Sequence, residues 1–327
     1  MSSRNHRVLL LGATGTIGRA TARALVRQGH DVVAFLRPQA DPQAAARALP
    51  GVTLRFGDVT AAESLAHDAF QGERFDVLVS CLASRTGAPR DAWAIDHDAH
   101  VLALEAARAA GVTQVVLLSA ICVQKPLLAF QQAKLAFEKK LMASGLTWSI
   151  VRPTAFFKSL SGQIERVRQG KPFLVFGDGT LTACKPVSDD DLGDFIAGCI
   201  GDTSRHDRIL PIGGPGEAIT PRQQGEYLFR LLGKPPKFRQ VPVGFLDAVI
   251  AVLSMLGRIL PPLAAKAELA RIGRYYATES MLVLDPVTGR YDPAATPSTG
   301  RETLFDFYER IVKQGERAPD LGDHAVF

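Results

Sequence analysis

The chain has 327 residues, of which 46% are apolar, enough for one large globular domain or a domain with a smaller lobe. Lys and Arg number 38 against 33 Asp and Glu, a net charge of +5, and their scattered distribution argues against a nucleic-acid-binding arm. The four cysteines form no CxxC pair, which argues against an iron–sulfur or zinc site and predicts reduced, mostly buried thiols.

The N-terminal residues 1–7 are polar and lead directly into an apolar segment, without the apolar core or cleavage site of a signal peptide. We therefore expect a cytoplasmic protein. The longest apolar stretch, 245–260, is interrupted by Asp247 and Arg258 and is shorter than the ~20 residues of a membrane span. It could rest on a membrane surface, but it is too short to cross the bilayer.

Short apolar runs alternate with amphipathic segments along the first half of the chain. We predict strands at 8–11, 32–36, 52–56, 77–82, 115–118 and 148–151. We predict helices between them at 19–27, 61–70, 93–110 and 127–142. This alternation predicts an α/β fold, a doubly wound parallel sheet of the Rossmann type with helices on both faces.

The pattern changes after residues 152–153, where Gly and Pro become more frequent. We therefore divide the chain into a first domain, 1–155, and a C-terminal region, 156–327. The first domain carries the alternating pattern. The second has the composition of a cap that would bind a substrate.

Some elements of the C-terminal region are expected to return to the sheet, namely a helix at 189–200 and a strand at 208–212. The three acids at 189–191 suit the first turn of that helix better than a metal cluster. A final helix is predicted at 302–312. The apolar helix predicted at 245–256 is expected to pack in a buried cap, with a wall for a substrate or a membrane contact as alternatives.

A glycine-rich turn joins the first predicted strand to the first predicted helix. Gly12 allows a tight turn, Gly15 lets a pyrophosphate approach the backbone, and Gly18 permits the helix to pack closely on the strand. The helix N-terminus then faces the negative charge. This context predicts a dinucleotide site rather than a purely structural turn. The remaining contacts predicted for the turn are Thr14, Thr16 and Ile17.

The residues that follow the next three strands predict which dinucleotide binds. Arg37 stands where NAD-preferring proteins carry an acid, and its positive charge favours the 2′-phosphate of NADPH. Asp58 and Val59 are placed to meet the adenine. The residues expected on the nicotinamide side are Ser80, Cys81 and Leu82.

Ser119 follows the fifth strand, and Lys134 lies on the next helix, four residues after Phe130. This order resembles the atypical branch of the short-chain dehydrogenase superfamily, whose members carry a Ser and a Tyr-x-x-x-Lys pair at these places. By that resemblance Lys134 binds the nicotinamide ribose and Ser119 lies beside the nicotinamide. Phe130 replaces the Tyr that exchanges a proton with a carbonyl or hydroxyl oxygen, so alcohol–ketone chemistry and sugar epimerisation are disfavoured.

Longer segments of the chain look like the divinyl chlorophyllide 8-vinyl reductases of chlorophyll and bacteriochlorophyll synthesis in photosynthesis. These segments are 80–85, 117–128, 130–134, 149–160, 176–179, 183–186, 281–286, 291–292 and 296–297. The resemblance implies an NADPH-dependent oxidoreductase that reduces the vinyl group of a magnesium tetrapyrrole, divinyl chlorophyllide or protochlorophyllide, to ethyl. Hydride would add to the terminal vinyl carbon and a proton to the inner one. No oxyanion forms, so a Tyr at position 130 has no role.

The same resemblance implies which other residues surround the reacting groups. The segment expected to close over the nicotinamide ring contributes Pro153, Thr154 and Phe156, and the substrate pocket contributes Phe130, Phe157 and Lys158. The proton donor stays open between Lys125, Lys158, Cys122 and an ordered water. Either lysine could instead be solvated or pair with a propionate of the substrate, and Cys122 could be a buried small hydrophobe.

Two other functions are compatible with the lost Tyr. One is a noncatalytic NADP-sensing or scaffold protein of the same branch. The other is an isoflavone-reductase-like enzyme acting on a small aromatic substrate. A resident metal is not expected, because His97 and His100, the only close pair of histidines, are better explained by surface or cofactor-facing roles than by metal ligation.

Overall fold

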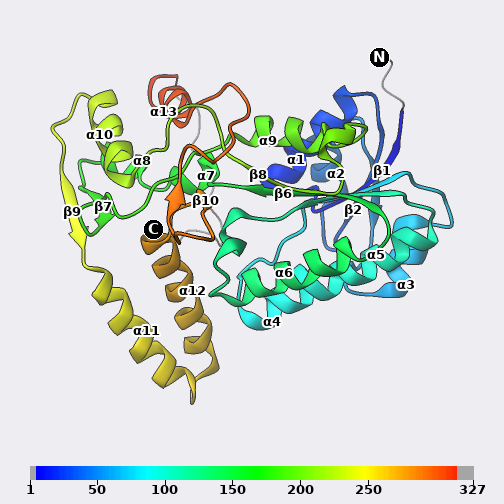
Figure 1. The fold of residues 1–327 in the computed structure, drawn as a ribbon, viewed down its shortest axis with the longest axis horizontal. Coiled ribbons are helices and arrows are strands. Elements are labelled where there is room, and N and C mark those ends of the chain that lie inside the picture. Colours follow the sequence, from blue (N-terminus) through cyan, green and yellow to red (C-terminus); the bar gives the residue numbers. More distant parts are fainter. Residues whose placement is uncertain (1–4, 315–327) are drawn as a thin grey trace.

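The computed structural model describes residues 5–314, so 1–4 and 315–327 lie outside the described residues. Within this range, seven strands form one parallel sheet in the order β3-β2-β1-β4-β5-β6-β8 (Figure 1). The strands are β1 (Arg7–Leu11), β2 (Asp31–Leu36), β3 (Thr53–Phe56), β4 (Val77–Ser80), β5 (Gln114–Leu118), β6 (Thr147–Pro153) and β8 (Arg208–Ile212). The predicted doubly wound parallel sheet is confirmed.

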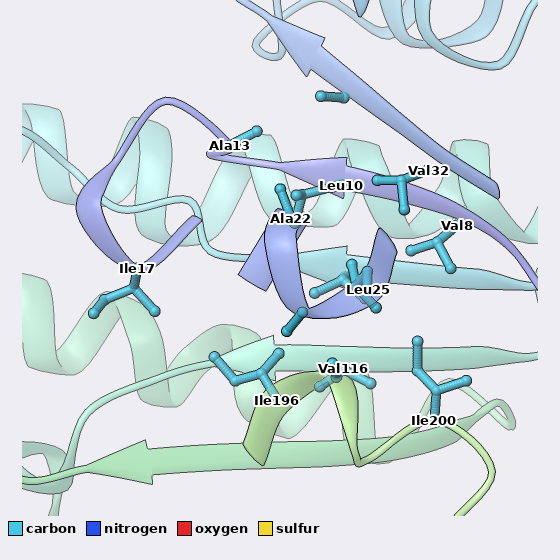
Figure 2. Packing of buried hydrophobic residues seen from close by; sticks show 14 of the residues in the cluster. Val8, Leu10, Ala13, Ile17, Ala22, Leu25, Val32, Val116, Ile196 and Ile200 are labelled. Carbon is cyan, nitrogen blue, oxygen red and sulfur yellow. The ribbon is translucent and has the colours of Figure 1, made fainter. Parts of the chain in front are cut away.

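Helices cover both faces of the sheet because alternate residues of each strand point to opposite faces. Leu10 of β1 packs on one face with Leu25 and Ile196 (Figure 2), whereas its neighbour Leu9 packs on the other with Leu141. The first face is covered by α1 (Thr16–Arg27), α2 (Pro42–Ala48) and α9 (Asp189–Ala197), and the second by η1 (Leu65–Phe70), α5 (His100–Ala109) and α6 (Ala129–Met142).

Two of the predicted helices contain π-helical turns that their periodicity did not reveal. The helix predicted at 61–70 consists of α3 (Ala62–Ser64) and the π-helix η1. The one predicted at 93–110 consists of the π-helix η2 (Trp93–Ala99) and α5, preceded by α4 (Pro89–Ala92). π-helical turns are rare and frequently lie at functional sites. Here η2 carries the buried Asp96, which forms an ion pair with Lys134.

The C-terminal region returns to the sheet as expected. β8 pairs with β6, and α9 begins after Ser188, whose side chain accepts a hydrogen bond from the Asp191 backbone. The acids 189–191 occupy the first turn of α9 as predicted. α9 approaches α1 closely at Gly193, where a Cβ atom would lie 2.6 Å from the Ala20 carbonyl carbon.

The rest of the C-terminal region builds a separate core beside the sheet (Figure 1). Fully buried members of that core include Val167, Leu228 and Tyr308. Its elements are α7 (Phe157–Leu160), α8 (Ile164–Arg168), β7 (Phe173–Phe176), α10 (Pro221–Leu231), β9 (Phe238–Val241) and α13 (Leu304–Lys313). Short connecting elements are η3 (Ile121–Gln124), η4 (Thr203–Arg205), β10 (Val283–Leu284) and β11 (Tyr291–Asp292).

A hairpin of two helices, α11 (Val243–Gly257) and α12 (Pro261–Thr278), projects from the body of the molecule (Figure 1). The expectation that the apolar segment 245–256 packs in a buried cap is wrong, because α11 has no buried residue. It contacts α12 and leaves Phe245 and Met255 about three-fifths exposed. None of the helices within residues 5–314 is long and apolar enough to cross a membrane.

Candidate active site

The glycine-rich turn brings the end of β1, the end of β4 and the start of α1 into backbone contact. Gly12 has a φ of +75°, and a Cβ there would lie 2.5 Å from the Cys81 carbonyl carbon. A Cβ on Gly18 would lie 2.1 Å from the Gly12 oxygen, so any side chain at either position would push the turn apart. Gly15 caps α1 without a side-chain hydrogen bond, and the first turn holds no acid. Its backbone N–H groups therefore face outward as anion donors.

The other residues predicted in the turn divide between surface and core. Thr14 is exposed and Thr16 is half-buried, whereas Ile17 packs into the sheet core. Arg19, which follows the third glycine, donates a 2.9 Å hydrogen bond to the Thr14 carbonyl and bridges the turn. No local pattern in the sequence indicates this contact of Arg19.

The ends of β2 and β3 present the predicted adenine-side residues at the surface. The Arg37 side chain is exposed. Asp58 is exposed too, but its carboxylate accepts hydrogen bonds from the Thr60 backbone and hydroxyl, and these lower the pKa of Asp58. Val59 is half-buried against the core beneath. Arg37 therefore offers an accessible charge, while the Asp58 carboxylate mainly holds its own turn.

A buried histidine stands behind the end of β4. The Nε2 of His100 lies 2.8 Å from the Ser80 hydroxyl, and its Nδ1 lies 2.9 Å from the Ile95 carbonyl. A carbonyl only accepts, so Nδ1 carries the proton and Ser80 donates to Nε2. Burial, reinforced by the charge of Lys134, lowers the pKa of His100 to about 4. Of the two roles expected for His100, surface or cofactor-facing, the surface role is wrong because the neutral imidazole is buried; it fixes the Ser80 hydroxyl.

The two neighbours of Ser80 are also held in place. The Leu82 backbone N–H lies 3.4 Å from the Ser80 hydroxyl. The Cys81 sulfur lies 3.6 Å from the Thr21 hydroxyl of α1. Burial raises the pKa of Cys81 to about 12, so the thiol stays protonated.

Ser119, at the end of β5, is held by a buried ion pair that the sequence analysis did not identify. Its hydroxyl donates a 2.5 Å hydrogen bond to the Glu138 carboxylate of α6. Arg152 of β6 donates to both oxygens of the same carboxylate. The Ser119 proton is therefore engaged, and the free lone pairs of its oxygen remain as acceptors.

Lys134 has an equally buried partner. Its Nζ lies 2.9 Å from the Oδ1 of Asp96, which η2 carries into the interior and which also accepts from the Ser84 backbone. The Asp96 side chain is completely buried, and its Oδ2 has no hydrogen-bond partner. Asp96 therefore fixes the ammonium of Lys134 next to the carboxyl ends of β4 and β5.

Helix α12 lies over the position of the missing Tyr. A Cβ on Gly87 would lie 3.0 Å from the Ile272 Cδ1 and 3.5 Å from the Phe130 Cδ1, so a helix from the C-terminal region and the Phe130 ring meet at one point. Tyr275 of the same helix donates a 2.9 Å hydrogen bond to the Cys122 carbonyl. Burial raises the pKa of the Cys122 thiol. Helix α12 thus joins this segment to the C-terminal region.

Lys125, one of the predicted catalytic residues, is committed to an ion pair. Its Nζ lies 2.7 Å from Oε1 of Glu279, just after α12. Tyr291 donates a 2.8 Å hydrogen bond to the other oxygen of Glu279. These contacts tie the segment after η3 to the C-terminal region.

The segment after β6 connects the two parts of the chain. Pro153 and Thr154 are buried, and Thr154 donates its hydroxyl to the Lys185 carbonyl. Phe156 is half-buried and forms an isolated bridge with Val187. Pro153 and Thr154 lie beside Ile212 at the end of β8, at the carboxyl edge of the sheet.

The next two residues differ in their surroundings. The Phe157 ring packs 5.3 Å from that of Phe307 in the C-terminal core, with 3% of its surface exposed, which leaves little of it to line a substrate pocket. Lys158 is half-buried near Asp189. The pKa of Asp189 is raised to about 6 by burial and by Asp190, although Lys158 opposes the shift.

Residues 5–314 contain no cluster of His, Cys, Asp and Glu that could hold a metal ion. His97 pairs with the adjacent Asp98, and His100 is committed to Ser80. What the carboxyl edge of the sheet does combine is an anion-binding helix end, a fixed Ser119 and a fixed Lys134. No acid stands at Phe130.

Comparison with known proteins shows which chains this one is similar to. The NAD(P)H-binding family matches residues 12–203. The chain is 50% identical to divinyl chlorophyllide a 8-vinyl-reductase of Oryza sativa subsp. indica over 98% of this chain and 82% of the relative. It is 47% identical to the reductase of the same name from Arabidopsis thaliana, over 98% and 80%.

Solved structures share the fold at lower identity. An NADPH-dependent quinone oxidoreductase of Escherichia coli, complexed with NADPH, has a TM-score of 0.66 at 18% identity, covering 93% of this chain and 99% of that one. An isoflavone reductase has a TM-score of 0.67 at 19% identity, covering 94% and 100%.

Proposed function

Because this chain belongs to the divinyl chlorophyllide a 8-vinyl-reductase family, we propose that it reduces the 8-vinyl group of divinyl chlorophyllide to ethyl with NADPH. The observation that carries the proposal is identity of about half over nearly the whole chain to four reductases of that name. The chain is therefore an NADPH-dependent oxidoreductase of chlorophyll biosynthesis. The site agrees, because it keeps Ser119 and Lys134 and has no acid at Phe130.

The residues around the glycine-rich turn suit a dinucleotide. The uncapped N-terminus of α1 offers backbone N–H groups to a pyrophosphate, and the space at Gly12 and Gly18 could not hold a side chain. The exposed Arg37 supplies a charge for the 2′-phosphate. When bound, NADPH supplies the hydride. The full set of residues proposed to hold it is Gly12, Thr14, Gly15, Thr16, Ile17, Gly18, Arg37, Asp58, Val59, Ser80, Cys81, Leu82, Ser119, Lys134, Pro153, Thr154 and Phe156.

On the nicotinamide side, the chain orients groups and supplies no proton. Lys134 is positioned by Asp96 to donate hydrogen bonds to the ribose hydroxyls. The Ser119 hydroxyl donates its hydrogen bond to Glu138, so its oxygen can accept a hydrogen bond from the carboxamide. Both residues thus act in cofactor orientation.

The substrate side is proposed to come from the region 156–327 together with Phe130. The Phe130 ring offers an apolar surface to a planar macrocycle, and Lys158 offers a cation to a propionate. Lys125 is already paired with Glu279, which supports a role in holding the segment rather than in proton transfer.

The test of the function is a direct assay with purified protein, NADPH and divinyl chlorophyllide. We expect a blue shift of the Soret band, an ethyl product and one NADPH oxidised per vinyl group reduced. NADPH binding without an ethyl product would favour a sensor or scaffold protein. Turnover of small aromatic enones but not of the pigment would favour an isoflavone-reductase-like enzyme.

The exposed face of α11 supports a second proposal, peripheral contact with the photosynthetic membrane. Phe245, Val252 and Met255 on α11 and Ile259 at the tip are all more than half exposed. Exposed apolar patches of this kind mark interaction surfaces. Arg258 beside the tip is also exposed and could meet anionic headgroups.

A further inference from the structure

Vinyl reduction requires a proton as well as a hydride, and the residues suggested by the sequence do not provide it. Phe130 carries no acid. The Ser119 hydroxyl already donates to Glu138, and the Lys125 ammonium is paired with Glu279. The Cys122 thiol is only 4% exposed. Of the other two candidates, Lys158 lies near Asp189, and an ordered water would need a side chain to orient it. If the chain has the proposed function, a group that reaches the space around Phe130 from another element is therefore the donor to look for.

Helix α12 brings such a group to this space. Ile272 on α12 meets Phe130 at Gly87, and Tyr276 lies four residues later, one helical turn along the same face. The Tyr276 phenol interacts with the thiol of Cys122, which in turn lies within the electrostatic reach of Lys134. The Tyr276 phenol therefore lies next to the segment of η3 and α6 that carries Cys122 and Phe130. It does so although Tyr276 follows Lys134 by 142 residues and Ser119 by 157 residues in the chain.

The two tyrosines of α12 differ in exposure. Tyr275 is 3% exposed and its hydroxyl is committed to the Cys122 carbonyl. Tyr276 is 38% exposed, and the rings of the two residues meet edge to face at 5.7 Å. Only a residue with an open surface can touch a substrate. Tyr275 therefore fastens α12 to the segment 121–124, and Tyr276 is the one of the two tyrosines with an exposed surface.

We propose that Tyr276 is the catalytic acid of this reductase and donates its phenolic proton to the inner carbon of the vinyl group. The hydride from NADPH forms the new C–H bond at the terminal vinyl carbon, and the π electrons of the C=C bond move to the inner carbon and the macrocycle. That carbon takes the Tyr276 proton, and the phenolate regains a proton from water. One hydride and one proton convert vinyl to ethyl, and NADPH is oxidised to NADP⁺.

The surroundings of Tyr276 keep it ready to donate. The Tyr276 residue is partly exposed, but its hydroxyl is desolvated beside Cys122; this desolvation first, and the proximity of Cys122 second, raise the pKa of Tyr276 well above its ordinary value. The phenol is therefore protonated throughout the neutral range. A carbanion next to an aromatic ring is a far stronger base than a phenolate, so transfer remains downhill.

The test compares Tyr276→Phe with Tyr275→Phe, a matched loss of one hydroxyl from the adjacent residue of the same helix. With NADPH and divinyl chlorophyllide, we expect Tyr276→Phe to lower kcat by about 100-fold or more, as general acids typically contribute 10²–10⁴-fold. NADPH affinity and thermal midpoint should stay near those of the wild type. Tyr275→Phe should keep kcat within about threefold and lose thermal stability, because it removes one buried hydrogen bond worth about 1 kcal/mol.

A kcat for Tyr276→Phe within about threefold of the wild-type value would overturn the proposal. So would a fall in kcat matched by equal losses of NADPH affinity and thermal midpoint, since that pattern marks a structural role. If the wild-type protein itself leaves the vinyl group intact, the proposed function fails. If the wild type is active and Tyr276→Phe is equally active, the role of Tyr276 as proton donor is rejected but the proposed function stands.

Discussion

The Nζ of Lys134 lies 2.9 Å from the Oδ1 of Asp96, and the carboxylate is completely buried. Asp96 belongs to a π-helical turn that joins α4 to α5, so the partner of the family Lys comes from a different helix. The Lys134 ammonium thus lies at the edge of the sheet, and each of the two charges is paired with the other. A buried charge without a partner is costly.

Replacing Asp96 with Asn should therefore affect both binding and stability. We expect the affinity for NADPH to fall about tenfold, because Lys134 loses its fixed position and a hydrogen bond to a charged group is worth about 1.5–3 kcal/mol. The free energy of unfolding should fall by about 3 kcal/mol. Fluorescence titration and urea denaturation measure the two quantities. Glu105→Gln, an exposed change on α5, is the control and should alter neither.

Arg37→Asp tests the choice of dinucleotide. The exposed guanidinium has no competing acid in the described structure, so reversing its charge should weaken NADPH about tenfold or more and NADH by less than about threefold. Arg47→Asp, an exposed position on α2, serves as the matched charge reversal. If the affinities for NADPH and NADH fall by equal factors, Arg37 does not bind the 2′-phosphate.

His100 should make the fold sensitive to acid. Its pKa is about 4 in the folded state and about 6.5 in the unfolded chain, so only the unfolded chain takes up a proton between these values. The stabilisation is complete above pH 6.5 and is lost as the pH falls toward 4. As the pH falls from 7 to 5, we expect the protonation of His100 in the unfolded chain to lower the free energy of unfolding by about 2 kcal/mol.

Urea denaturation of the wild type and His100→Gln at both pH values isolates this contribution. The variant cannot titrate and should show a pH dependence smaller by that amount. Identical pH dependence in the two proteins would show that the imidazole does not set it.

The hairpin surface can be tested with lipid vesicles that contain anionic lipid. We expect the wild type to float with the vesicles, and the double variant Met255→Ser and Ile259→Ser to lose about tenfold in partitioning, because two apolar side chains no longer enter the interface. Val287→Ser, 91% exposed in another loop, is the control. A wild type that stays in solution would contradict membrane contact. Self-association lost in the double variant would assign the face to a second copy of the chain.

The strands could be predicted because the spacing of apolar residues and the polarity of a segment are local properties of the sequence. Gly12, Gly15 and Gly18 were informative for the same reason, since a strand, a turn and a helix follow one another there. The apolar pattern of 245–256 led to the wrong prediction that this helix is buried in a cap. An all-round apolar helix indicates that something covers it, and the sequence does not contain that partner.

The partners of the site residues could not be predicted from local patterns. Asp96 of η2 pairs with Lys134 of α6, and Glu138 of α6 accepts a hydrogen bond from Ser119 at the end of β5. Tyr276 comes from a helix that the chain forms more than a hundred residues later. Each of these residue types is ordinary at its position in sequence, and only the packing of distant elements brings them to one place.

The pairing of β8 with β6, and the backbone contact of α9 with α1 at Gly193, also set the order of events during synthesis. A nascent chain that has reached residue 155 contains β1 to β6 but not β8 or α9, so its sheet would end at an unpaired β6 edge and one face of α1 would be uncovered. Such an edge invites association with other chains. The residues proposed to hold the dinucleotide all lie before position 157, but the strand and the helix that complete their sheet are made only when synthesis has reached Ile212, about two-thirds of the chain.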